Sequence, residues 1–158
     1  MEIPLTKGQI ALIDDEDYDL ISQYKWHVIE KHGYYANTKV KISGKQKNLS
    51  MHRLIMNAQP GQYVDHINHN TLDNRKSNLR ICTAQQNQMN KKKKPGLSMY
   101  KGVAWDKICE KWSARIKFNG KNLYLGRFDE EIEAAKAYNE AASKYFGEFA
   151  HFNYTRGK

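Results

Sequence analysis

The stretch Val64-Asp65-His66-Ile67-Asn68-His69-Asn70 is followed by Asn74-Arg75-Lys76-Ser77-Asn78-Leu79-Arg80 and then by Gln86-Asn87. It brings together a carboxylate, histidines and several asparagines. Carboxylate and amide oxygens are the ligands that a hard cation such as Mg²⁺ prefers. An imidazole that titrates near neutral pH suits proton transfer. These residue types predict a hydrolytic site that combines a metal ion with a general base.

A helix is expected directly after this stretch. Thr83-Ala84-Gln85-Gln86 has the spacing of a capping box, so the helix should begin at Thr83. Asn87 then lies one turn into the helix, beside the end of the strand that carries Asp65. The region holds few carboxylates, whereas a two-metal nuclease needs several that converge. The pattern therefore favours a single metal, with Asp73 interpreted as a turn residue.

The joint pattern resembles the HNH family of ββα-metal nucleases over roughly residues 50–90, most closely its phage and homing-type branch. In that family a strand delivers an Asp-His pair, a loop carries a structural Asn, and the next helix supplies a last His or Asn. The resemblance implies that His66 is the general base and that Asn78 holds the loop and orients His66. It implies that Asp65 and Asn87 bind one Mg²⁺ or Mn²⁺, and that the products carry 5′-phosphate and 3′-hydroxyl ends.

Other polar residues of this region have two interpretations. Arg75, Lys76 and Arg80 either contact DNA phosphates or are ordinary solvated side chains. His52 is interpreted as structural, and His69 as an exposed loop residue.

The first 50 residues predict a small α+β layer. A short helix is expected from Asp17 to Tyr24, and alternating residues predict a half-buried strand from Tyr34 to Ile42. Ser43-Gly44-Lys45 is a predicted turn. The acidic cluster around Asp14–Asp19 is interpreted as a solvated helix start rather than a metal site.

The C-terminal part predicts three strands and a helix. Two β-rich runs, Trp112–Phe118 and Lys121–Phe128, flank Asn119-Gly120, a strong hairpin signal because both turn positions need positive φ. Tyr100–Trp105 supplies a third strand, and Asp129 is expected to cap the helix. The expected inner face of that helix, which should end at Gly147, is Ile132, Ala135, Tyr138, Ala142, Tyr145 and Phe146.

Residues 98–153 resemble the plant APETALA2/ethylene-response domain in the order and spacing of five motifs. They are Tyr100-Lys101-Gly102-Val103, Lys111-Trp112-Ser113-Ala114-Arg115-Ile116, Tyr124-Leu125-Gly126-Arg127-Phe128, Glu133-Ala134-Ala135-Lys136-Ala137-Tyr138 and Phe152-Asn153. Members of that family dock a three-stranded sheet in the major groove of DNA, with the helix behind it. The resemblance implies DNA contacts by Lys101, Trp105, Lys111, Arg115, Lys117, Tyr124 and Arg127. Ala104 and Arg115 depart from the family pattern, so the plant base preference is not carried over.

Charge is uneven along the chain. The net charge is +9; residues 1–90 carry 11 Lys/Arg and 9 Asp/Glu, and residues 91–158 carry 15 and 8. This balance favours an acidic partner such as a nucleic-acid backbone. Residues 91–97 form an expected linker, in which Lys91, Lys92, Lys93 and Lys94 either follow phosphates or serve as a solvated spacer.

Together these features predict an α+β protein. Residues 1–90 are expected to form a nuclease domain, with an extension (1–50) and a ββα-metal core (50–90). A three-stranded antiparallel sheet on one α-helix is expected over residues 98–153. We expect a metal-dependent, site-directed endonuclease that nicks double-stranded DNA. Two alternatives remain, namely a DNA-binding regulator with an inactive nuclease site and a nuclease of structured RNA.

The composition excludes several other classes of protein. No apolar run is long enough to span a membrane or to act as a signal peptide, and two cysteines are too few for a disulfide framework. We expect a monomer or weak dimer without a small-molecule cofactor. We expect it in the cytoplasm of a bacterial host and encoded by a phage or mobile element.

Overall fold

The computed structural model describes residues 1–31, 33–93 and 96–154. These residues form a mixed α+β protein with four small antiparallel sheets and few helices. The chain divides into two compact units, Met1–Asn87 and Gln88–Lys158. The described part of the chain contains no helix long and apolar enough to cross a membrane.

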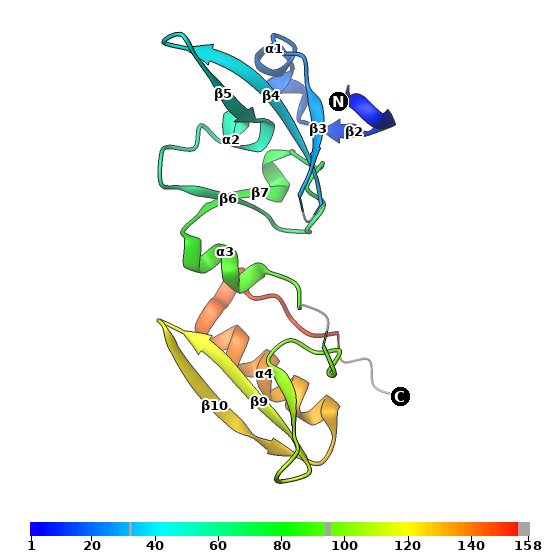
Figure 1. The fold of residues 1–158 in the computed structure, drawn as a ribbon, viewed down its shortest axis with the longest axis vertical. Helices are drawn as coiled ribbons and strands as arrows, with labels where there is room; N and C mark the ends of the chain where they lie inside the picture. Colours follow the sequence, from blue (N-terminus) through cyan, green and yellow to red (C-terminus); the bar gives the residue numbers. More distant parts are fainter. Residues whose placement is uncertain (32, 94–95, 155–158) are drawn as a thin grey trace. The chain divides into compact units, whose positions relative to one another are not determined.

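The first unit is built from two N-terminal sheets. In the smaller one, β1 (Glu2–Pro4) pairs with β2 (Ile10–Leu12). The larger has the order β3–β4–β5, from β3 (His27–Glu30), β4 (Tyr34–Ile42) and β5 (Lys45–Ser50). The bounds of β4 confirm the strand predicted from alternating residues (Figure 1).

The β4–β5 hairpin extends past its neighbouring strand. The last pair between β3 and β4 is His27 with Asn37, whereas β4 continues to pair with β5 as far as Ile42. At the tip, Ser43 and Gly44 have φ of 49° and 77°, the positive values that a two-residue hairpin turn requires. The predicted turn is confirmed, and it closes a two-stranded ribbon.

The expected helix from Asp17 to Tyr24 is shorter than predicted. A 3₁₀ turn, Asp15–Asp17, leads into α1, which spans only Tyr18–Ile21. The carbonyl of Ile21 accepts hydrogen bonds from the Trp26 indole at 2.9 Å and from the backbone N–H of Tyr24. Because these donors occupy the carbonyl, the chain turns away instead of adding another helical turn.

The remaining elements of the first unit carry the polar stretch. Helix α2 (Met51–Ile55) contacts β4, β5 and β6 (Tyr63–His66), and β6 pairs antiparallel with β7 (Leu79–Cys82). Helix α3 (Ala84–Asn90) follows β7; its residues up to Asn87 belong to the first unit and its last three to the second. One hydrophobic core joins the sheets and α2, and it contains Ile3, Leu5, Ala11, Ile13, Ile21, Trp26, Val28, Ala36, Met51, Ile55 and Leu79.

The second unit contains one sheet and one long helix. The strands β8 (Val103–Asp106), β9 (Lys111–Phe118) and β10 (Lys121–Phe128) lie in the order β10–β9–β8. Asn119 and Gly120 have φ of 48° and 76°, so the predicted Asn-Gly hairpin turn is confirmed.

Helix α4 (Glu131–Phe146) covers one face of this sheet. Small buried residues such as Ala134, Ala135 and Ala142 let the helix lie close to the strands, and Tyr138 fills the space between them. The predicted cap by Asp129 is wrong, because the N-cap position is Glu130 and Asp129 instead pairs with Lys111. The predicted end at Gly147 is confirmed, since its N–H bonds to the carbonyl of Ser143.

Two contacts fix the start of β8. A side chain at Gly102 (φ +76°) would lie 2.1 Å from the Tyr138 ring and 2.5 Å from the Arg115 carbonyl. Asn153 binds the backbone of Lys101 with both ends of its amide, and Asn139 binds the backbone of Asn153 in the same way. The end of the described chain is thereby tied to the entrance of the sheet.

Candidate active site and nucleic-acid-binding surface

Strands β6 and β7 place Asp65 and His66 side by side. The two residues end β6 and pair with Arg80 and Leu79 of β7. Both are buried, with 7% and 5% of their surface exposed. A buried carboxylate and imidazole at neighbouring positions require specific partners, since unpaired polar groups are costly to bury.

Arg80 is a partner of Asp65. Its guanidinium donates from Nη2 at 2.8 Å and from Nε at 3.1 Å to Asp65 Oδ2, and both side chains are largely buried. The ion pair gives the buried Asp65 carboxylate a partner of opposite charge. Arg80, which the sequence suggested as a phosphate contact, is therefore engaged with the site carboxylate.

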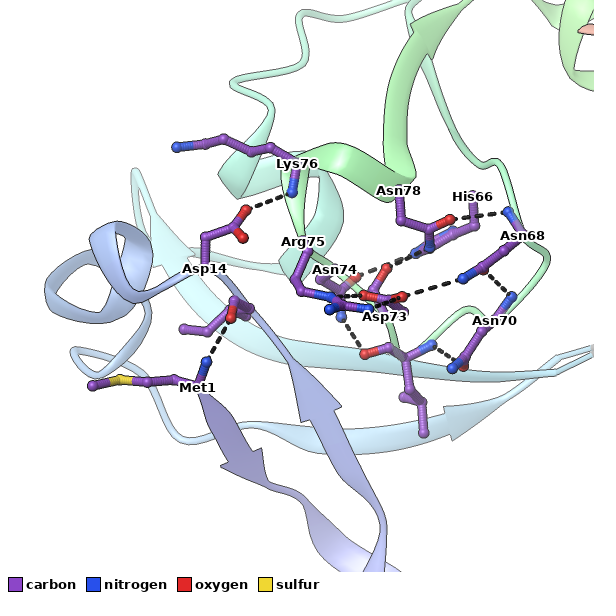
Figure 2. Close-up of polar contacts among 12 residues, drawn as sticks. Met1, Asp14, His66, Asn68, Asn70, Asp73, Asn74, Arg75, Lys76 and Asn78 are labelled. Carbon is purple, nitrogen blue, oxygen red and sulfur yellow. Dashed lines mark hydrogen bonds and ion pairs between the residues drawn. The ribbon is translucent and has the colours of Figure 1, made fainter.

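The hydrogen-bond partner of the His66 ring is Asn74. Asn74 Oδ1 lies 3.3 Å from His66 Nε2 (Figure 2). The other end of the Asn74 amide donates to the carbonyl of Leu72 at 3.2 Å and to the Met51 sulfur at 3.5 Å. A carbonyl can only accept, so the Asn74 oxygen faces the imidazole and Nε2 carries the proton. The Nδ1 nitrogen of neutral His66 is then the basic one.

Asn78 holds the loop between β6 and β7. Its Oδ1 accepts from the N–H of Asn68 at 2.9 Å, and its Nδ2 donates to the carbonyl of Asp73 at 2.8 Å. Its own carbonyl accepts from the N–H of Ile67. Figure 2 shows the two bonds of the Asn78 side chain. Together with the bond from Ile67 they cross the loop, so they fix the path of the chain beyond His66.

Asp73 is a buried anchor within this loop. Its carboxylate accepts two hydrogen bonds from Arg75, both at 2.8 Å, and a third from Asn68. The bond from Arg75 is the main reason that the pKa of Asp73 lies below its usual value. Arg75 thus pairs with the loop, although its own side chain remains about half exposed.

Lys76 is held by the N-terminal acidic residues. Its ammonium pairs with Glu16 and with Asp17 at 2.9 Å, and its backbone N–H donates to Asp14. The acidic cluster that was interpreted as a solvated helix start therefore binds the loop that carries Asn78. These contacts dock the N-terminal extension against the polar stretch.

Two aromatic residues from outside the predicted site surround His66. The His52 ring of α2 lies 5.1 Å from the His66 ring, centroid to centroid, and the Tyr35 ring of β4 lies 6.1 Å from it. Burial lowers the pKa of His52 to about 3 and also lowers the pKa of His66 from its usual value. Desolvation and the Asp65 carboxylate raise the pKa of Tyr35. Both histidines are therefore neutral at physiological pH.

Asn87 lies in the first turns of α3. Thr83 Oγ1 accepts from the N–H of Gln86 at 3.2 Å, and Gln86 Oε1 accepts from the N–H of Thr83 at 2.8 Å, so the predicted capping box is confirmed. Asn87 is half-buried and its N–H bonds to the Thr83 carbonyl. No cluster of three His, Cys, Asp or Glu residues suited to a metal occurs in the described ranges. The oxygen donors of Asp65 and Asn87 still match the chemistry of a hard cation that keeps several waters.

The second unit presents a polar sheet face opposite α4. Alternation along β9 directs Arg115 and Lys117 away from the buried Ala114 and Ile116, and the register places Tyr124 beside Arg115. The predicted residues that share this open face are Lys111, Arg115, Lys117, Tyr124 and Arg127. Two of them form ion pairs, Lys111 with Asp129 and Arg127 with Asp106.

Two other predicted contacts lie elsewhere in this unit. Trp105 pairs with Trp112, their ring centroids 5.1 Å apart, and Trp112 packs against the cluster under α4. The Lys101 ammonium donates to the carbonyls of Met89 and Lys91, and its burial lowers its pKa to about 8.

The lysine run lies at the start of the second unit. Lys91 and Lys92 are exposed and Lys93 is partly exposed, whereas Lys94 lies outside the described residues.

Comparisons with known proteins identify the family. A family model described as HNH endonuclease matches residues 51–89. A protein of Acanthamoeba polyphaga mimivirus, named an uncharacterized HNH endonuclease, is 37% identical over 147 residues, which cover 91% of this chain and 74% of the viral protein. Protein 3.8 of Escherichia phage T7 is 31% identical over 93 residues, covering 58% of this chain and 76% of the phage protein.

The second unit has relatives of a different kind. APETALA2-like protein 2 of Oryza sativa subsp. japonica is 43% identical over 61 residues, which is 37% of this chain and 14% of the plant protein. This similarity covers the C-terminal region. No solved structure matches the chain. The chain belongs to the HNH endonuclease family and is an enzyme of that class, with DNA as the substrate that the family implies.

Proposed function

We propose that this endonuclease is metal-dependent and site-directed, and that it nicks one strand of duplex DNA. The observation that carries the proposal is the buried Asp65-His66 pair, in which Asn74 leaves the His66 Nδ1 as the basic nitrogen. A fixed, neutral imidazole is suited to take a proton from water at neutral pH. Within the described residues we identify one such pair per chain, which favours cutting one strand at a time.

The proposed reaction is hydrolysis of a phosphodiester bond. His66 Nδ1 accepts a proton from the attacking water, whose oxygen forms a bond to phosphorus while the bond to the 3′ oxygen breaks. Asn74 holds the ring in place from the opposite nitrogen, and Asn78 holds the loop. The products carry 5′-phosphate and 3′-hydroxyl ends.

Asp65 and Asn87 are the proposed ligands of one Mg²⁺ or Mn²⁺. When bound, the ion supplies positive charge that stabilises the phosphate and the departing oxygen. The Arg80 guanidinium also contacts Asp65, through its Oδ2. We propose the order β6–β7–α3 as the ββα-metal arrangement of the family.

The second unit is proposed to hold the enzyme on duplex DNA. Its open sheet face carries long basic side chains, which reach phosphates and guanine edges. The viral and phage relatives support an origin in a virus or mobile element. The phage relative alone supports the proposed action inside a bacterial host cell.

Conversion of supercoiled plasmid to the nicked form tests this proposal. We expect nicking with Mg²⁺ or Mn²⁺, none with EDTA, and loss of at least about 100-fold in rate for His66→Ala. The variant should still bind DNA, which separates the chemical step from binding. Tight binding without cutting across several metals and targets would instead indicate a DNA-binding regulator.

A further inference from the structure

The β4–β5 hairpin of the first unit differs in charge from the chain that precedes it. Residues 1–30 contain seven Asp/Glu and two Lys/Arg, whereas residues 31–64 contain six Lys/Arg and no Asp or Glu. Four of those six are lysines of the hairpin, namely Lys39, Lys41, Lys45 and Lys47, and all four are exposed. Among the described residues, none of the four forms an ion pair with a carboxylate.

The geometry of the hairpin makes it a projecting arm. Past Asn37 no third strand pairs with the hairpin (Figure 1). Beyond the buried Thr38, residues 39–48 form a two-stranded ribbon in which all residues except the half-buried Val40 are exposed. The major groove of B-form DNA is wide enough to admit a ribbon of this kind. An isolated hairpin gains little stability in water, so its length calls for a reason other than the core.

The two faces of the arm are not equivalent. Side chains alternate along a strand, so Tyr35, Lys39 and Lys41 point to the same face of β4. The Tyr35 ring contacts the rings of His66 and His52, which places the candidate active site on that side. Lys45 and Lys47 pair with Ile42 and Val40 and lie on the opposite face.

Distances along the strand match the dimensions of DNA. A strand rises about 3.3 Å per residue, so Lys39 and Lys41 lie about 13 Å and 20 Å along β4 from Tyr35. Phosphates on one strand of DNA follow at about 3.4 Å along the helix axis. A duplex with its scissile phosphate at His66 therefore brings phosphates about four to six base pairs away next to these lysines.

We propose that the β4–β5 hairpin is a DNA-binding arm of the nuclease unit, and that Lys39 and Lys41 contact backbone phosphates beside the cleavage site. The inference rests on the proposed function, because it takes the duplex to lie across His66. Lysines on exposed strands also discourage pairing between edges, but that role would not distinguish the two faces. The two pairs of lysines therefore provide a matched comparison.

The test uses the full chain with Lys39→Gln and Lys41→Gln together, and Lys45→Gln and Lys47→Gln as the control of equal charge. With supercoiled plasmid we expect the first pair to raise KM about tenfold with kcat unchanged, and the control to change KM less than about twofold. On a short duplex in EDTA, the slope of log affinity against log salt should fall by about 1.8 for the first pair. All four positions are exposed, so thermal unfolding should be unchanged.

Equal effects of the two pairs on KM and on the salt slope would overturn the assignment of Lys39 and Lys41. An unchanged salt slope in the first pair would overturn the DNA-binding arm itself. A wild-type protein that never nicks plasmid would instead refute the proposed function. The binding measurements on the short duplex would still decide whether the hairpin contacts DNA.

Discussion

At the scale of single residues, the site depends on Asn74 as much as on His66. Asn74 is completely buried and its amide is oriented by the Leu72 carbonyl and the Met51 sulfur. Its oxygen then faces His66 Nε2 and determines which nitrogen of the ring carries the proton. In the proposed reaction, a buried residue beside His66 thereby selects the ring nitrogen that takes the proton from water.

Replacing Asn74 should separate catalysis from binding. We expect Asn74→Ala to lower kcat about 10–100-fold with little change in KM, because the imidazole loses its orienting partner. Long-range ¹H–¹⁵N spectra of labelled histidines should show the Nε2–H form of His66 in the wild type and a mixture in the variant. Asn68→Ala, which removes a loop bond to Asp73 but leaves Asn74 in place, is the control. An unchanged tautomer in Asn74→Ala would contradict the role given to Asn74.

His52 should make stability depend on pH. Burial lowers its pKa to about 3 in the folded protein, whereas the unfolded chain has the ordinary histidine value. Between those values the unfolded state binds the extra proton, so the free energy of unfolding falls as pH decreases below about 6.5. The expected slope from His52 is about 1.4 kcal/mol per pH unit.

Thermal unfolding of the first unit, measured in EDTA at a series of pH values from 7 to 5, checks this expectation. His66 contributes in the same direction, since its pKa is also lowered. His52→Gln should therefore reduce the pH dependence but not abolish it. Wild type and His52→Gln with the same pH dependence would mean that His52 is not buried in the neutral form.

Residues of the site differ in how far the sequence predicts them. Asp65, His66 and the Thr83 capping box are recognisable because their meaning depends on near neighbours in the chain. Tyr35 and His52 were not predicted as neighbours of His66, because tertiary contacts of β4 and α2 bring them there. Asn74 stands in a run of polar residues from Asp73 to Asn78, so nothing in the sequence distinguishes it from its neighbours.

At the scale of elements, Gly102, the residue just before β8, has no room for a side chain. We expect Gly102→Ala to destabilise the second unit by about 3 kcal/mol or more, because a Cβ would overlap the Tyr138 ring and the Arg115 carbonyl. Gly120 has the same φ of +76° but open space around it. Gly120→Ala should therefore cost only about 1–2 kcal/mol, and denaturant unfolding of both variants measures the difference. Equal losses would show that backbone strain alone explains the effect.

Duplex binding by the open face of β9 should be sensitive to the substitution of Arg115. If Arg115 reads a base, Arg115→Ala should weaken duplex binding by about 1–3 kcal/mol and relax the preference at one base position. Lys136→Ala on the exposed side of α4 removes the same charge and is the control. Affinity and preference equal to those of the wild type would remove Arg115 from the contacts.

Elements with regular alternation were the most predictable ones. The strands from Tyr34 and from Lys121 match their patterns, whereas β8 begins at Val103 rather than Tyr100. Lys101 therefore lies before the strand, and period-two alternation does not describe its direction. Helix α1 is short because the Trp26 indole donates a hydrogen bond to the carbonyl of Ile21. Helix propensities of single residues do not predict such a contact.

At the scale of the whole molecule, the proposed function assigns cutting to the HNH region and DNA binding to the second unit. We expect a chain that ends at Asn90 to keep metal-dependent nicking but to bind duplex DNA roughly 100-fold more weakly, because it loses most of the net positive charge. Nicking at saturating plasmid and binding at fixed salt measure the two effects. If the shortened chain bound duplex DNA as tightly as the full chain, the proposed role of the second unit in binding would be contradicted.

The network of Asn153, Asn139 and Lys101 bears on how such a protein arises. Asn153 binds the backbone of Lys101, so the two ends of the segment 98–153 that is similar to the plant domain lie next to each other. A segment with adjacent ends can be inserted into another protein, or appended to it, without disrupting the fold of that protein. The presence of a similar segment within a much longer plant protein is what such portability would produce.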